Sequence, residues 1–388
     1  MKESQKRYLT LVGDPNQVNT WSNIPYFFLL AGQSEGFLDI GLPLQPQKLR
    51  IQRWIWNLNS WLQRGETGGF QYSSFFLNRL FSQVSLNGEP VEFISHFPLL
   101  PPAPWETDWI VNYYIDATLH QNFEDYGLAD KVGQTVQKAA LEQEQKNYEK
   151  AQRIVCMSHS AAQSVVTNYS ISSSKVHVIP GGTNFKENTL PTAEQLLADP
   201  IPSLDPLRLG FIGKDWRRKG LSYALQIAET LHSREIAVEV MAIGPSIQEL
   251  SPHPLIKPLG FIDKAQELPR FIQLVRSFHF GCLFSSAEAF GISNLECLRL
   301  GIPVLASNVG GIPDTVPEGL GFLIEPESPP QEVADLLERF VQKPSTYSKL
   351  RRQVAARAGE FTWQQTVKKF QRVWQGSKDF CYDAIAIR

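Results

Sequence analysis

One stretch of the chain constrains the fold more than any other. Residues 283–313 read LFSSAEAFGISNLECLRLGIPVLASNVGGIP and overlap an apolar run at residues 278–284. This pattern predicts a buried strand, a loop, a short helix over residues 293–300 and a second strand over residues 303–306. Two strands joined by a helix pair in parallel within one sheet, so the stretch predicts an α/β domain.

The same alternation of strands and helices occurs twice along the chain. A proline-rich segment separates the first array from a second array that begins with an apolar strand. We therefore predict two doubly wound domains with a cleft between them. The predicted boundaries are 1–190 for the N-terminal domain, 191–206 for the linker, 207–360 for the C-terminal domain and 361–388 for a closing helical segment.

The composition limits the possible functions. At 388 residues, with 43% hydrophobic and 20% charged residues, the chain is typical of a soluble protein with two domains. A net charge of −2 argues against a dedicated nucleic-acid binder. The four cysteines form no CxxC pair, which favours reduced thiols in a cytoplasmic protein over a metal site or disulfides. No apolar run reaches about 18 residues and no signal-peptide core begins the chain, so we expect no membrane-spanning segment.

The loop and helix of the constraining stretch carry two carboxylates, Glu288 and Glu296. Between them, Phe290, Gly291 and Ile292 place free backbone N–H groups at a helix N-terminus, a site that suits an anion such as phosphate. Each carboxylate can accept two hydrogen bonds from a vicinal diol. An anion site between two diol acceptors suits a nucleotide sugar, with the diphosphate between ribose and hexose. The alternative is an ordinary β-α-β crossover with two solvated glutamates.

A second signal lies in the loop that follows the first strand of the C-terminal array. The segment GKDWRRKG, residues 213–220, carries four cations within six positions, between two glycines. This loop and the glutamate loop both follow strands of one predicted parallel sheet, so both face the same crevice. Cations opposite a helix N-terminus would clamp a diphosphate and stabilise it as a leaving group. The alternative is a solvated basic turn.

In the N-terminal array, two groups of polar residues follow predicted strands. Ser22 or Asn23 would cap the first helix. Asp116 and His120 follow a later strand, at the end where ligands approach an open α/β sheet.

One predicted helix of the N-terminal array is rich in tryptophan. Residues 48–64, KLRIQRWIWNLNSWLQR, place tryptophan, leucine and isoleucine at helical spacing, with basic residues on the flanks. This stripe either packs on the sheet of its own domain or lies on a membrane surface, with the tryptophans at the interface.

Three motifs of the C-terminal half resemble retaining glycosyltransferases of the GT-B type, in particular the large family-four group (glycosyl transferases group 1). They are GxxWRRKG at residues 213–220, two glutamates separated by seven residues at Glu288 and Glu296, and GIPVLAS…GGIPD at residues 301–314. The N-terminal half resembles this family through TWSNIPY and HVIPGGTN. The resemblance implies two Rossmann-like domains, the first for the acceptor and the second for a nucleotide sugar. It also implies a final helix that crosses back to the first domain.

The resemblance implies a role for each matched residue. Arg218 and Lys219 would hold the donor diphosphate. Glu288 would hold the transferred sugar, and Glu296 the ribose hydroxyls. The other donor-binding candidates are Gly213, Lys214, Gly244, Phe261, Ile262, Phe290, Gly291, Ile292, Ser22 and Asn23.

The chain departs from the family pattern at three places. Lys214 stands where an arginine is common, so the charge is kept but the bidentate fork is lost. Asn23 stands where glycine is usual, and asparagine tolerates a left-handed backbone better than most residues. Many relatives carry a sugar-binding histidine near the segment YYIDATLH, and here both Asp116 and His120 are candidates for that catalytic position.

The chain contains no Asp-x-Asp, the metal–diphosphate motif of the other major glycosyltransferase fold. We therefore expect metal-independent transfer of a hexose from a UDP- or GDP-sugar to a hydroxyl, with retention of configuration and no bound cofactor. The alternatives are a sugar-nucleotide epimerase, a glycogen-phosphorylase-like enzyme with pyridoxal phosphate, and a non-catalytic regulatory protein that binds a nucleotide sugar. A dinucleotide oxidoreductase is disfavoured because no GxGxxG follows a predicted strand.

The sequence leaves the acceptor open. The aromatic segments at residues 48–64 and 70–81 suit a saccharide or a lipid-linked acceptor, and a small molecule remains a third possibility. The expected partners are therefore a nucleotide sugar and one of these acceptors, without nucleic acid. The expected location is the cytoplasm, with peripheral attachment to the inner membrane surface as a second interpretation.

Overall fold

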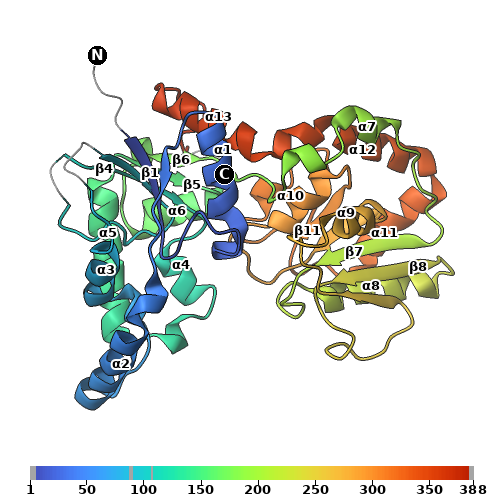
Figure 1. The fold of residues 1–388 in the computed structure, drawn as a ribbon. Coiled ribbons are helices and arrows are strands. Elements are labelled where there is room, and N and C mark those ends of the chain that lie inside the picture. Colours follow the sequence, from blue (N-terminus) through green and yellow to red (C-terminus); the bar gives the residue numbers. More distant parts are fainter. Residues whose placement is uncertain (1–5, 87–90, 106–107, 384–388) are drawn as a thin grey trace. The chain divides into compact units, whose positions relative to one another are not determined.

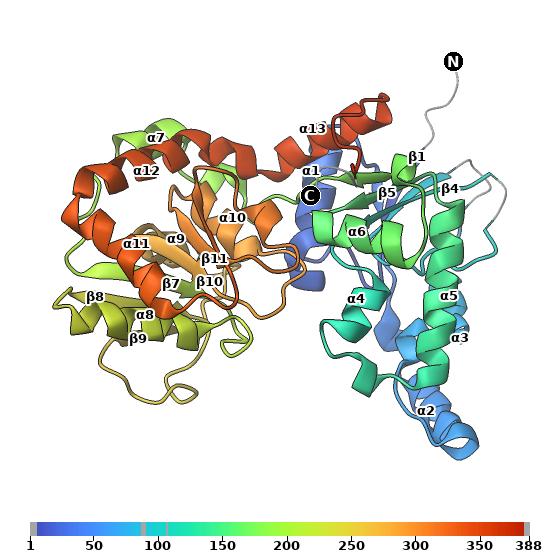
Figure 2. The same ribbon diagram turned by 180° about the vertical axis from the view of Figure 1, so that it is seen from behind.

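The computed structural model describes residues 6–86, 91–105 and 108–383. The chain divides into two compact units (Figures 1 and 2): unit 1 comprises Met1–Asn184 and Trp363–Arg388, and unit 2 comprises Phe185–Thr362. Each unit contains a six-stranded sheet whose neighbouring strands all run parallel. The repeated alternation of strands and helices thus corresponds to two separate α/β units, each with its own parallel sheet, as expected.

The sheet of unit 1 has the strand order β2-β1-β3-β4-β5-β6. The direction of the connections reverses between β1 and β3, which makes this position the switch point, where doubly wound sheets bind ligands beyond the strand ends. The strands are β1 (Lys6–Thr10), β2 (Ile40–Gly41), β3 (Val91–Ser95), β4 (Ile110–Ile115), β5 (Arg153–Cys156) and β6 (Val176–Val178). The helices are α1 (Ile24–Ser34), α2 (Arg50–Arg64), α3 (Ser74–Phe81), α4 (Leu119–Glu124), α5 (Gln134–Lys150), α6 (His159–Asn168) and α13 (Trp363–Trp374).

Helix α13 completes the aromatic core of unit 1, although 178 residues of unit 2 precede it in the chain. The Phe370 ring lies 5.1 Å from Phe28 of α1 and 4.8 Å from Tyr114 of β4, centroid to centroid. The Trp374 Nε1–H group donates to Glu92 Oε1 of β3 at 2.7 Å. Since this indole gives the buried carboxylate of Glu92 a donor, the end of the helix is held by a polar contact as well as by apolar burial.

The sheet of unit 2 has the order β12-β11-β10-β7-β8-β9, with its switch point between β7 and β10. Cys282 faces the core that α8 and α11 cover, whereas a Cβ on the neighbouring Gly281 would meet Cys297 of α10, so α10 covers the opposite face. The strands are β7 (Leu207–Ile212), β8 (Val238–Ile243), β9 (Ile256–Gly260), β10 (Phe280–Leu283), β11 (Val304–Ser307) and β12 (Gly321–Ile324). The helices are α7 (Ala193–Ala198), α8 (Leu221–Ser233), α9 (Leu268–Arg276), α10 (Ile292–Arg299), α11 (Pro330–Gln342) and α12 (Pro344–Arg357).

Residues 191–206 do not form the separate linker that their prolines suggested. They lie within unit 2, where Thr192 opens α7 with a capping box completed by Gln195. Leu196 of this helix is buried against Ala355 and Ala358. The prolines end short elements here, and the apolar face between them still packs.

Two helices of unit 1 depart from the usual division into buried apolar and exposed polar residues. Helix α5 is largely polar, yet its Glu144, Asn147 and Tyr148 are fully buried, and each of them has a hydrogen-bond partner. In α2, only Ser60 is buried, so the apolar stripe does not pack on the sheet of its own unit. Within the described chain, none of the helices has both the length and the apolar composition needed to cross a membrane.

Candidate functional site

Two loops leave the sheet of unit 2 at its switch point. Residues 213–220 follow β7 and residues 284–291 follow β10. Because the carboxyl ends of parallel strands lie at one edge of a sheet, both loops emerge on the same side. The backbone N–H of Ser286 donates to the carbonyl oxygen of Arg218 at 3.0 Å, which joins the two loops directly.

Glu288 links these loops through its side chain. Its Oε2 lies 3.0 Å from Lys219 Nζ and 3.2 Å from Arg218 Nη1, and accepts a hydrogen bond from Ser285 Oγ at 3.2 Å. The side chains of Glu288 and Lys219 are only 14% and 16% exposed. Arg218 and Lys219 therefore share the Glu288 carboxylate in partial shelter from water.

The guanidinium of Arg218 is held in its charged form. Burial alone would lower the pKa of Arg218, but the carboxylates of Glu288 and Asp215 outweigh this effect and raise the pKa. Asp215 also orients the side chain, because its Oδ2 accepts from Arg218 Nε at 3.1 Å. Arg218 is thus a fixed cation with its fork directed toward the Glu288 loop.

Glycine is required where the basic loop meets β10. Gly220 has φ +75°, and a Cβ atom on it would lie 2.1 Å from the carbonyl oxygen of Phe284. Gly310 meets the other side of the glutamate loop, with φ +52° and a Cβ position 2.3 Å from the carbonyl oxygen of Glu288. These close backbone contacts explain why the two motifs carry glycine at these positions.

The second carboxylate, Glu296, lies in α10 and is 1% exposed. It forms an ion pair with Lys264. The Lys264 ammonium also lies 5.2 Å from the centre of the Phe271 ring. The sequence does not point to Lys264, because its only signal there is its position directly after the turn at Asp263, beyond β9.

Helix α10 begins at Gly291 without a side-chain cap. The expectation of free amides is met only in part, because the backbone N–H of Ile292 donates to the carbonyl oxygen of Phe290 at 2.8 Å and that of Asn294 to Gly291 at 2.9 Å. The hydroxyl oxygen of Ser293 is buried, and among the described residues it has no hydrogen-bond partner. A buried polar atom without a partner in this turn fits a group that supplies one when it binds. The sequence pattern alone gives no sign of this role for Ser293.

The carboxyl ends of β7, β8 and β9 meet closely at glycines. Gly244 has φ +122°, and a Cβ atom there would lie 2.2 Å from the carbonyl oxygen of Gly213. Next to this junction, Phe261 is 58% exposed and Lys214 Nζ lies 4.1 Å from the centre of its ring. Ile262, by contrast, is buried. An exposed aromatic ring with a cation over it is a surface on which a nucleotide base could stack.

The four cations of the basic loop therefore separate into different environments. Only Arg218 and Lys219 approach Glu288. Lys214 lies over Phe261, and Arg217 lies over the ring of its neighbour Trp216 at 4.3 Å. The candidate anion site therefore includes only two of the four cations in the sequence motif, Arg218 and Lys219.

Four predicted site residues belong to unit 1: Ser22, Asn23, Asp116 and His120. The backbone at Ser22 and Asn23 is left-handed, with φ +55° and +70°, so Asn23 adopts the conformation expected of a glycine substitute. Asn23 stands at the N-cap of α1, but neither residue caps the helix with its side chain. The strained turn is instead held by Asn184, whose Nδ2 donates to the carbonyl oxygen of Ser22 at 2.7 Å.

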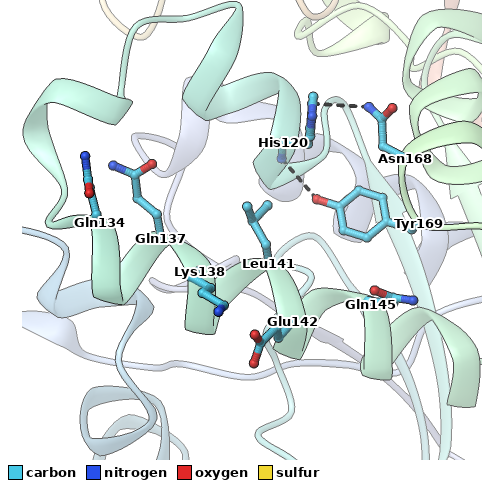
Figure 3. A pocket seen from close by; sticks show the side chains of 9 residues that line it. All are labelled: His120, Gln134, Gln137, Lys138, Leu141, Glu142, Gln145, Asn168 and Tyr169. Carbon is cyan, nitrogen blue, oxygen red and sulfur yellow. Dashed lines mark hydrogen bonds between the residues drawn. The ribbon is translucent and has the colours of Figure 1, made fainter.

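His120 lines a pocket of about 450 Å³ on unit 1 (Figure 3). Its Nδ1 lies 3.2 Å from Asn168 Nδ2, and its backbone N–H donates to the hydroxyl oxygen of Tyr169 at 3.0 Å. Asp116, at the end of β4, is not among the described residues that line this pocket. The structure thus separates the surroundings of the two candidates. The other lining residues are Gln134, Gln137, Lys138, Leu141, Glu142 and Gln145.

A buried carboxylate supports the helix that carries His120. Glu144 accepts hydrogen bonds from the backbone N–H of Leu119 at 3.0 Å, from Tyr148 at 2.7 Å and from the hydroxyl of Tyr169. Burial raises its pKa to about 7, although these hydrogen bonds act in the opposite direction. Sequence analysis missed this group, because its partners come from three separate segments.

Metal ligands do not gather at this site. Across residues 6–86, 91–105 and 108–383, no three His, Cys, Asp or Glu side chains lie close enough together to hold a metal ion. The four cysteines form no disulfide, and three of them are buried.

The sequence matches known families over part of its length. Residues 198–359 match the family model described as "Glycosyl transferases group 1". A D-inositol 3-phosphate glycosyltransferase of Paenarthrobacter aurescens (strain TC1) is 26% identical over 234 residues, which cover 58% of this chain and 57% of the relative. The enzyme of that name from Mycolicibacterium gilvum (strain PYR-GCK) is 26% identical over 236 residues, covering 58% and 52%. The chain spans about half the length of these curated relatives.

Solved structures share the fold over nearly the whole chain. Sucrose-phosphate synthase (tll1590) from Thermosynechococcus elongatus superposes with a TM-score of 0.64 at 16% identity, covering 96% of this chain and 98% of that one. Anabaena Alr3699/HepE, solved in complex with UDP and glucose, superposes with a TM-score of 0.62 at 14% identity, covering 96% and 100%. These likenesses confirm the expected fold class, two Rossmann-like doubly wound domains of the GT-B type.

Proposed function

Because residues 198–359 match the family model of glycosyl transferases group 1, we propose that the chain is a member of this family and transfers a hexose from a nucleoside-diphosphate sugar to a hydroxyl acceptor. The observation that carries the proposal is the convergence of Arg218, Lys219 and Glu288 at the switch point of unit 2. Two cations and a carboxylate from separate loops, beside an uncapped helix, form the chemistry that a diphosphate joined to a sugar requires.

We assign the donor diphosphate to Arg218, Lys219 and the first turn of α10. Both cations contact Glu288, so the carboxylate holds them in place and neutralises part of their charge. A diphosphate that enters here would replace Glu288 as their anionic partner. Glu288 would then be free to accept hydrogen bonds from hydroxyls of the transferred sugar.

The nucleoside would extend toward β9. Glu296 would accept hydrogen bonds from the two ribose hydroxyls. Its ion pair with Lys264 would break or rearrange as the nucleoside binds. The base would stack at Phe261, with Lys214 and the glycine backbone of Gly213 and Gly244 beside it. This arrangement suits a purine or a pyrimidine, and the relative solved with UDP and glucose supports testing UDP-glucose first.

We propose that transfer proceeds with retention and without a metal ion. The acceptor hydroxyl would attack from the face that the diphosphate leaves, and a donor phosphate oxygen would take the hydroxyl proton. As the bond from the anomeric carbon to the phosphate oxygen breaks, negative charge grows on the diphosphate. Arg218, Lys219 and the amides of α10 would stabilise that charge, which is the work that a metal ion performs in other glycosyltransferases.

Unit 1 would bind the acceptor, in our proposal, with Asp116 or His120 in contact with the reacting sugar. The acceptor class stays a saccharide, a lipid-linked molecule or a small molecule. Three buried cysteines without a disulfide fit a reducing compartment, so we propose the cytoplasm as the location of the protein. Peripheral association with a membrane is a separate proposal, because the membrane would bind to helix α2 and not to the donor site.

The proposal is tested first by thermal denaturation with a panel of UDP- and GDP-sugars, since a ligand that binds the folded state raises its apparent stability. The stabilising donor is then incubated with candidate acceptors, and NMR of the product gives its anomeric configuration. Retention is contradicted by an inverted product, and metal independence by a complete loss of transfer in EDTA. Conversion of the donor to an epimer without an acceptor would identify an epimerase. Tight donor binding without any turnover would identify a regulatory binding protein.

A further inference from the structure

Helix α2 exposes a continuous apolar stripe. Trp54 and Trp61 are 67% and 57% exposed, and Ile51 is 74% exposed. With Ile55, Leu58 and Leu62, which are also exposed, they cover an arc of roughly 120° on one side of the helix. Contiguous apolar patches of this kind mark interaction sites in soluble domains.

The opposite side of α2 is the one that packs on unit 1. Trp56 lies 5.6 Å from Phe70, ring centre to ring centre, and Asn57 accepts a hydrogen bond from the backbone of Gly68 at 3.4 Å. In Figures 1 and 2 the helix projects from the end of unit 1, beyond α3. The apolar stripe thus faces away from the core of its own unit.

The charge of this segment has one sign. Residues 46–64 contain Lys48, Arg50, Arg53 and Arg64 and no acidic residue, in a chain whose net charge is −2. All four basic residues are exposed. On a helical projection Arg50, Arg53 and Arg64 lie along one flank of the apolar stripe.

A small pocket behind the helix adds to this positive surface. It has a volume of about 210 Å³ and is lined by Arg53 of α2 and by Lys131, together with backbone and side chains of residues 68–72. Two cations at the rim of one pocket, next to an exposed apolar stripe, suit the phosphate of a lipid headgroup.

We propose that α2 is a membrane-docking helix, which lies in the interface of an anionic lipid bilayer with Trp54 and Trp61 inserted and its basic flank on the headgroups. Helix α2 has 15 residues, and three of them are arginines, so it is too short and too charged to span a bilayer but suits the plane of its surface. Tryptophan is favoured at that depth because its ring is apolar and its N–H remains hydrated.

A second copy of the chain fits this surface less well. A symmetric dimer with antiparallel α2 helices would bring the same basic flank of both copies together, and in a parallel or antiparallel pair the helix offers no acidic residue to either basic flank. An anionic bilayer instead supplies charge of the opposite sign along the whole helix.

The experiment is co-sedimentation of the full-length protein, without donor, with vesicles of phosphatidylcholine alone or mixed equally with phosphatidylglycerol. We expect binding to the anionic vesicles at low salt and a marked loss at high salt. The double variant Trp54→Ser/Trp61→Ser should reduce binding at least about tenfold. The double variant Arg50→Gln/Arg53→Gln should reduce it about 30-fold.

Matched controls use exposed residues of unit 2. Ile247→Ser removes an apolar side chain that is 67% exposed, and Lys257→Gln/Lys349→Gln removes two exposed cations, so neither should change binding. Circular dichroism of each variant establishes that it is folded.

The proposal is overturned if the wild type binds neither kind of vesicle, or if the tryptophan variant binds as well as the wild type does. It is also overturned if the tryptophan variant turns a dimer into a monomer in light scattering, because the stripe would then be an interface between copies. Since vesicle binding is measured without donor or acceptor, failure of the glycosyl-transfer proposal leaves this result unaffected.

Discussion

The Oε2 atom of Glu288 lies 3.0 Å from Nζ of Lys219, although 69 residues separate them in the chain. The same oxygen lies 3.2 Å from Nη1 of Arg218. A carboxylate that engages two cations at once keeps both side chains extended toward one point. We interpret the ion pair as a placeholder for the donor diphosphate, which requires the same two cations at the same place.

Removal of the Lys219 ammonium should therefore impair transfer more than folding. We expect Lys219→Ala to lower kcat/KM by about 10²–10³, the effect of losing one preorganised donor to a developing negative charge. The matched control is Arg217→Ala in the same loop, because Arg217 lies over Trp216 instead of Glu288. Full activity of Lys219→Ala, or an equal loss in both variants, would refute the diphosphate assignment.

If Glu296 binds the ribose hydroxyls, its substitution should weaken nucleotide binding. We expect Glu296→Gln to weaken binding of UDP about 10- to 100-fold, because charge-assisted hydrogen bonds to the diol are lost. The sharper measurement is calorimetric comparison of UDP with 2′-deoxy-UDP, or of the guanosine pair if the donor carries guanine. The wild type should prefer the ribonucleotide, and the variant should discriminate much less. An unchanged preference in Glu296→Gln would place the ribose elsewhere.

The backbone at Gly220 should not accept a side chain. Gly220→Ala places a methyl group in a left-handed residue and 2.1 Å from a carbonyl oxygen, so we expect a loss of at least about 2 kcal/mol in the free energy of unfolding. Gly359→Ala is the control, because nothing lies within 4 Å of its Cβ position and its φ is ordinary, and its effect should stay within about 0.5 kcal/mol. Urea denaturation measures both. Equal stabilities of the two variants would contradict the structure of the loop.

The buried carboxylate of Glu144 should make the stability of unit 1 depend on pH. Burial raises its pKa from 4.5 to about 7 in the folded protein. Between these values the folded state holds a proton that the unfolded state has released, so the free energy of unfolding falls as pH rises through this window. Relative to Glu144→Gln, the wild type should lose up to about 3 kcal/mol between pH 4.5 and pH 8.

Two buried histidines of unit 1 act in the opposite direction. Burial lowers the pKa of His96 and of His177 to about 4, so the stability they contribute is present above about pH 6.5 and is lost as pH falls toward 4. Both histidines are present in the wild type and in Glu144→Gln, so their effect cancels in the difference. If urea titrations at pH 5 and pH 8 give the same difference between the two proteins, Glu144 does not titrate as the structure indicates.

The proximity of the two loops in the candidate site of unit 2 could be predicted from the sequence, because parallel strands bring their carboxyl ends to one edge. The expectation that the basic loop and the glutamate loop lie together is met by the contact between Arg218 and Glu288. Their roles stay proposals. Lys264 could not be found in this way, because its contact with Glu296 depends on the path of the loop beyond β9.

Other features escaped the sequence for different physical reasons. Helical periodicity identifies the apolar stripe of α2 but does not say what covers it, so the periodicity was compatible with burial and with exposure alike. Proline content suggested a linker at residues 191–206, but proline ends helices without preventing the packing of Leu196. Glu144 lies in a polar stretch of sequence that gives no sign of its burial. Hydrogen bonds from Leu119, Tyr148 and Tyr169 offset the free-energy cost of removing its carboxyl group from water.

The insertion of unit 2 into unit 1 has a consequence for biosynthesis. Residues 185–362 form one continuous segment, so this unit can fold as soon as it leaves the ribosome. Unit 1 cannot complete its core before α13 is synthesised, because Phe370 of α13 packs on Phe28 and Trp374 donates a hydrogen bond to Glu92. We expect ribosome-bound chains stopped before residue 363 to resist protease within unit 2 and to be cleaved within unit 1. Until α13 has been synthesised, a chaperone would need to cover the face of α1 on which α13 packs.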